Sequence, residues 1–170
     1  MAPHVSVSAV KKAAREVIDL LGEYAGKHVP SREMLIDPVL YALLRGRHEK
    51  VKRQHTLPLV KKRKKAKRID FRCGGSNPAV LEFAVRPPKG GGQLYGSQNV
   101  SELRKLTRVP KTQARLRILL LVDLCANPLD VGNLKATYKC VSSGPGKFAR
   151  QAVRVVYVHR SVEASFPWRP

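Results

Sequence analysis

Apolar residues recur at helical spacing in two stretches near the start of the chain. In residues 5 to 24 they form one stripe, with lysines, arginines and acids on the other side, which is the pattern of an amphipathic helix. Residues 31 to 45 repeat this pattern and predict a second helix. Pro38 lies inside the second pattern, and because proline removes a helical hydrogen bond we expect a break or kink near Asp37.

The next part of the chain contains short apolar runs that indicate strands. Residues 50 to 60 alternate between basic and apolar side chains, and Pro58 places this strand at the edge of a sheet. The stretch from Arg68 to Pro87 predicts two strands joined by a Gly-Gly-Ser-Asn-Pro turn. Residues 116 to 125 are almost continuously aliphatic, which is typical of a strand buried on both faces in the middle of a mixed sheet.

Helical spacing returns between these strands, at Asn99 to Val109. Residues 129 to 136 indicate a short helix or turn, residues 153 to 158 a last strand, and residues 161 to 170 a C-terminal tail. The elements therefore follow in the order helix, helix, three strands, helix, strand, short helix and strand. This order predicts one domain over residues 1 to 170, of the α/β or α+β class, with a small mixed central sheet flanked by helices.

Two acidic residues lie on the central hairpin, Asp70 on its first strand and Glu82 on its second. A carboxylate on a buried strand is costly unless a positive group meets it, and antiparallel pairing can bring these two side by side. A divalent cation, Mg²⁺ or Mn²⁺, is the first candidate for that group, held by both acids and the carbonyl of Phe83. Neutralisation by Arg72 and Arg86 is the alternative.

The placement of Asp70 and Glu82 resembles the motif of the PD-(D/E)XK nuclease superfamily, which has an Asp on one strand and a Glu-x-Lys on the next. Asn99 to Val109 and Arg117 to Leu124 look like the helix and strand that follow this motif, so the similarity covers about half of the chain. It implies a restriction-endonuclease-like core and metal-dependent hydrolysis of phosphodiesters in DNA. It also implies that an acid on the preceding helix, here Glu33, joins the metal site, although a glutamate in a first turn also compensates the helix dipole.

One position departs from the motif, because Ala84 stands where the family has its lysine. In the family this lysine positions or deprotonates the attacking water. Lys67 or Lys105 could reach the site from another element, and Arg86, which stays protonated and shares the strand face of Glu82, could stabilise the transition state. If no such group serves, the chain is a catalytically inactive nucleic-acid-binding protein with a nuclease fold.

Lysine and arginine outnumber the acids by 33 to 12, which gives a net charge of +21. Such an excess favours a polyanionic partner. The densest segment spans residues 61 to 68, where seven of eight residues are basic: Lys61, Lys62, Arg63, Lys64, Lys65, Lys67 and Arg68. A second basic surface is expected on the helix at 99 to 109, from Arg104, Lys105, Arg108 and the following Lys111.

Nucleic acid is therefore the expected partner, and duplex DNA is favoured because the ten aromatic residues form no stacking pattern for single strands. A ribonucleoprotein component is a further alternative, and the resemblance leaves a homodimer open. The sequence has no run of eighteen apolar residues and no signal-peptide pattern, so we expect an intracellular protein without a membrane partner. The three cysteines and five histidines show no zinc-binding spacing.

Overall fold

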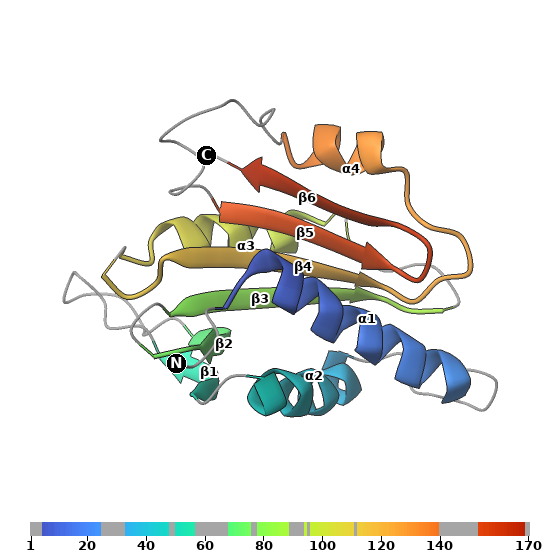
Figure 1. Ribbon diagram of the computed structural model, residues 1–170. Helices are drawn as coiled ribbons and strands as arrows, with labels where there is room; N and C mark the ends of the chain where they lie inside the picture. The colour runs from blue at the N-terminus through green and yellow to red at the C-terminus, as the bar shows by residue number, and fades with distance from the viewer. Residues whose placement is uncertain are drawn as a thin grey trace.

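The computed structural model describes residues 5–24, 33–47, 50–56, 68–75, 78–88, 94, 96–110, 112–139 and 153–168, without the side chains of 22–24 and 33–35. The helices are α1 (Val7–Tyr24), α2 (Glu33–Arg47), α3 (Ser97–Thr107) and α4 (Val131–Thr137). The strands are β1 (Val51–Thr56), β2 (Arg68–Cys73), β3 (Ala79–Arg86), β4 (Leu116–Asp123), β5 (Val153–His159) and β6 (Glu163–Trp168). In the described residues the fold is thus a mixed six-stranded sheet with four helices, and the α+β prediction is confirmed (Figure 1).

The strands lie in the sheet in the same order as in the chain, from β1 to β6. The β1–β2, β2–β3 and β5–β6 pairs are antiparallel, whereas β3–β4 and β4–β5 are parallel. A parallel pair needs a crossover connection, and α3 supplies one between β3 and β4. The aliphatic β4 lies between two parallel neighbours with its residues after Leu116 buried, which confirms the prediction of a central buried strand.

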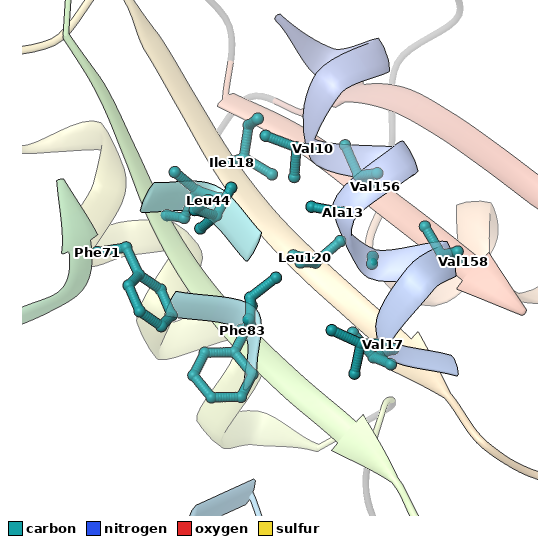
Figure 2. Close-up of a cluster of buried hydrophobic side chains, with 14 of the residues drawn as sticks. Val10, Ala13, Val17, Leu44, Phe71, Phe83, Ile118, Leu120, Val156 and Val158 are labelled. Carbon is teal, nitrogen blue, oxygen red and sulfur yellow. The ribbon is translucent and has the colours of Figure 1, made fainter. Parts of the chain in front are cut away.

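Helices cover both faces of the sheet. Helices α1 and α2 pack on one face through a hydrophobic cluster that includes β3, β4 and β5, and α3 and α4 pack on the other through a second cluster. Figure 2 shows Val10, Ala13 and Val17 of α1 lying against Leu120 of β4 and the β5 valines. None of the described helices is long and apolar enough to cross a bilayer.

The structure corrects the expectations for two segments. Helix α2 continues through Pro38 as one helix, so the break expected near Asp37 is absent. The proline removes one helical hydrogen bond, but Ile36, Leu40 and Leu44 are buried around it. Residues 161 to 170 were expected to be a tail, but Glu163–Trp168 form β6 along β5, and Trp168 is buried. This pairing covers an edge of β5 that would otherwise expose unpaired backbone groups.

Candidate functional site

The candidate site lies where β2 and β3 separate. These strands pair only between Phe71–Cys73 and Ala79–Leu81. The next residue on each strand, Asp70 on β2 and Glu82 on β3, therefore borders a gap in the ladder. The backbone N–H of Phe83 donates instead to Asp70 Oδ2, at 3.1 Å. The carboxylate of Asp70 therefore replaces a main-chain acceptor, and this fixes it beside the backbone of β3.

The backbone turns at this point in β2. Phe71 packs in the cluster under α1 and α2, but Ile69 packs in the cluster under α3, whereas regular alternation would place residues two apart on the same face. Gln54, opposite Asp70 in the β1–β2 ladder, has a φ of 48°, a left-handed conformation that is uncommon outside glycine. Its Nε2 lies 3.4 Å from Asp70 Oδ1. Residue-by-residue patterning does not anticipate this irregularity, which aims Asp70 into the gap.

Glu82 lies in β3 with only 2% of its surface exposed. Burial, and after it the negative charge of Asp70, raises the pKa of Glu82 to about 10. The two acids are therefore close enough to interact, as their strand positions predict. Beyond its contact with Lys105, Glu82 Oε1 has no hydrogen-bond partner among the described residues, so the site holds a buried carboxyl group with unused hydrogen-bonding capacity.

Lys105 reaches the carboxyl group of Glu82 from α3. Its Nζ lies 2.7 Å from Glu82 Oε1, forms a second ion pair with Glu102 one turn earlier on the helix, and donates to the carbonyl of Arg68 at 2.9 Å. These three acceptors match the three N–H groups of a lysine ammonium. Burial works to lower the pKa of Lys105, but Glu102 and Glu82 outweigh it and the net pKa is raised.

Three residues were proposed to supply the positive group that is missing at Ala84, and they differ in where the structure places them. Lys105 meets Glu82, and its side chain is only 15% exposed, so it does not belong to the outer basic face of the helix. Arg86 pairs instead with Asp123, Nη1 to Oδ2 at 3.1 Å. Lys67 lies outside the described residues.

Helix α2 contributes an acid that the sequence interpretation did not select. Burial raises the pKa of Asp37, the guanidinium of Arg53 opposes this, and the charge of Asp70 adds to it, so Asp37 lies within electrostatic range of the site. Arg53 forms an ion pair with Asp37 and stacks over the Tyr41 ring, 5.4 Å from its centroid. Glu33 begins the same helix, but its side chain lies outside the described residues. Residues four apart share a helix face, so the pattern that drew attention to Glu33 applies equally to Asp37.

The chemistry of the donor set fits a hard divalent cation. Asp70 and Glu82 offer carboxylate oxygens, and the carbonyl of Phe83 faces the same side of β3 as its amide, toward Asp70. Among the described residues no group of three histidine, cysteine, aspartate or glutamate side chains is close enough to form a closed metal cage. Mg²⁺ does not require one, because one or two carboxylates with water and substrate phosphate complete its octahedron.

The predicted nucleic-acid surfaces are described only in part. Arg104 is exposed on α3, Arg108 is exposed just after the end of α3, and Arg68 is exposed at the start of β2. The remaining members of the two basic surfaces lie outside the described residues: Lys61, Lys62, Arg63, Lys64, Lys65, Lys67 and Lys111. Their role stays a prediction.

A second polar cluster lies at the carboxyl ends of β3, β4 and β5. Arg86, Asp123 and His159 occupy one row across these strands. Asp123 is fully buried and accepts from the Tyr157 hydroxyl at 2.6 Å and from the backbone N–H of Cys125 at 3.0 Å. Both ring nitrogens of His159 also have hydrogen-bond partners. Because its polar atoms are mutually satisfied, we interpret this cluster as a structural network.

The chain matches no protein-family model, no curated protein and no solved structure, so its function has to be inferred from the geometry of the site.

Proposed function

We propose that this protein is a metal-dependent nuclease that binds duplex DNA through basic surfaces and hydrolyses its phosphodiester bonds inside the cell. The observation that carries the proposal is the 2.7 Å contact between Lys105 Nζ and Glu82 Oε1. It supplies, from α3, the ammonium group that the resembled motif would place at Ala84. The proposal thus assigns a restriction-endonuclease-like role to Asp70, Glu82 and Lys105 together.

In this proposal Asp70, Glu82 and the carbonyl of Phe83 hold Mg²⁺ or Mn²⁺. The ion supplies stabilisation of the developing phosphate charge and a more acidic water. Lys105 stays protonated at neutral pH because its pKa is raised, so it donates hydrogen bonds to the attacking water or to a phosphate oxygen and does not accept a proton. This differs from the role of a general base.

The three contacts of Lys105 suggest how it becomes available to substrate. If Glu82 held a cation, its oxygen would no longer need the ammonium, and one N–H group of Lys105 would be free to donate to substrate. Glu102 and the carbonyl of Arg68 still hold Lys105 in place. Glu102 is therefore a positioning residue, and in the metal-free protein the ammonium of Lys105 is the hydrogen-bond donor to the Glu82 carboxyl.

Moving the lysine between its two possible positions tests the proposal. Lys105→Met should lower the Mg²⁺-dependent cleavage rate by on the order of a hundredfold, as the loss of one preorganised hydrogen-bond donor to the reacting group does. Ala84→Lys in the Lys105→Met protein should recover part of the rate, because residue 84 faces α3 on the same strand face as Glu82. Lys12→Met is the matched control, since Lys12 is an exposed lysine of α1 on the other side of the sheet.

Cleavage should be followed on supercoiled and linear duplex DNA and on single strands of DNA and RNA. Nicking before linearisation would indicate one site acting at a time, whereas direct linearisation would support a homodimer with two sites. Calorimetry should find Mg²⁺ or Mn²⁺ binding that Asp70→Asn or Glu82→Gln abolishes. Tight DNA binding by an inert wild type, with Ala84→Lys and Asp70→Asn equally inert, would refute the nuclease and support the inactive binding protein.

A further inference from the structure

We propose that Lys50, Lys52 and Arg72, named here the basic strip, bind the sugar-phosphate backbone of duplex nucleic acid beside the Asp70–Glu82 site. The inference rests on the nucleic-acid substrate proposed above, but it does not depend on cleavage. None of these residues belongs to the basic surfaces that the sequence suggests. The sheet register brings them together.

The strand geometry places the strip on the α3 side of the sheet. Lys52 is directly opposite Arg72, which lies between the buried Phe71 and Cys73 of β2. Val51 and Cys73 pack in the cluster under α1 and α2, so Lys52 and Arg72 point to the opposite face. Lys50 is exposed two residues before Lys52 and follows the same alternation.

The strip adjoins the candidate metal site. Arg72 is two residues from Asp70 along β2 and is opposite Val80 of β3, two residues before Glu82. Val80 packs in the cluster under α3, which is the helix that provides Lys105. A backbone lying on the strip would therefore run toward the two carboxylates and the ammonium group.

Within the described residues, no ion pair involves Lys52 or Arg72. Like charges directly opposite each other on paired strands are destabilising, and a bound anion would relieve this repulsion. The positive charges of the strip also act on His55. Its pKa is lowered first by burial and then by the charges of Arg72 and Lys52. The face is thus electropositive, and no described residue forms an ion pair with either of these two side chains.

The surroundings favour a phosphate backbone over other occupants. Base stacking needs exposed aromatic rings, and membrane binding by insertion needs exposed apolar side chains. Among the described residues the only large hydrophobic side chain that is exposed is Leu20, on α1. A strip of charges on a protein of net charge +21 fits contact with phosphates without base readout.

Salt-dependent binding of a short blunt DNA duplex in EDTA tests the strip separately from catalysis. The Lys52→Ala/Arg72→Ala protein should bind more weakly, and its plot of log affinity against log salt should be shallower by about 1.8, or about 0.9 for each lost phosphate contact. The control is Lys12→Ala/Arg45→Ala, which removes one lysine and one arginine from exposed positions on α1 and α2. Its slope should match that of the wild type.

Equal slopes for the strip and control variants would overturn the proposal, because only total charge would then matter. Retained DNA binding with lost binding to anionic lipid vesicles would also overturn it, in favour of a lipid surface. Lys52→Gln/Arg72→Gln removes the charges but keeps longer, polar side chains than alanine, and provides a second measurement if the alanine variant does not fold. Because EDTA prevents metal-dependent cleavage, a failed nuclease assay leaves this result unaffected, and the reverse also holds.

Discussion

Glu82 should make the metal-free protein less stable as the pH rises. Its folded-state pKa of about 10 is far above the ordinary value of 4.5. Between these two values the folded protein retains a proton that the unfolded chain releases, so unfolding becomes easier with increasing pH. The stabilisation from the protonated carboxyl is complete below about pH 4.5 and is lost as the pH approaches 10.

The size of the effect follows from proton linkage. One group that is fully protonated when folded and ionised when unfolded changes the free energy of unfolding by about 1.4 kcal/mol per pH unit. Between pH 6 and pH 8 the loss would be about 3 kcal/mol, a large share of the 5–15 kcal/mol typical of a domain. This is an upper limit, because a single carboxyl group exchanges at most one proton between the folded and unfolded states.

Urea unfolding of wild type and Glu82→Gln at pH 6 and pH 8, both in EDTA, measures this effect. The glutamine cannot ionise, so the stability of the variant relative to wild type should increase with pH. Glu16→Gln is the matched control, since Arg47 lowers the pKa of Glu16 and no slope is expected from it above pH 6. If the difference between wild type and Glu82→Gln is the same at both pH values, Glu82 is already ionised by its ion pair, and the reasoning is refuted.

Two further substitutions probe the surroundings of the site. Glu102→Gln removes the negative charge from one of the three acceptors of Lys105 and should lower the cleavage rate roughly tenfold, as losses of supporting partners do. Duplex affinity measured in EDTA should be unchanged, because a large loss of binding would point to misfolding. Tyr157→Phe removes a hydroxyl that donates to Asp123 and accepts from the N–H of Leu129. It should destabilise the protein by about 1–3 kcal/mol in urea unfolding, and an unchanged midpoint would contradict a structural role for that network.

The fold follows from sequence where one local pattern decides the outcome. The aliphatic composition of β4 identifies a strand buried on both faces, and the stripe of α1 identifies the helix that covers it. Pro38 suggested a break in α2 because a proline removes a local hydrogen bond. Buried contacts on both sides of Pro38 nevertheless hold α2 together. Strand β6 was missed because its short, Pro-containing sequence is ordered by pairing with β5, which no local pattern reports.

The candidate site was only partly predictable for the same reason. Asp70 and Glu82 could be selected because acids are unexpected on buried strands. Their shared environment depends on the premature end of β2–β3 pairing and on the left-handed Gln54, which are properties of the assembled sheet. Asp37 lies on α2 one turn from Glu33, the acid that the resemblance suggested, and only tertiary packing brings Asp37 within electrostatic range of Asp70.

The position of Lys105 illustrates how the core sets the chemistry of the site. Leu103 and Leu106, both fully buried, fix how α3 lies on the sheet. A shift of one residue in this packing would rotate every α3 side chain by about 100° around the helix axis, and Lys105 would then leave Glu82. A lysine at position 84 would reach Glu82 along the strand, independently of α3. In this protein the same contact depends on helix–sheet packing, so substitutions beneath α3 should disturb the site even though they touch neither Asp70 nor Glu82.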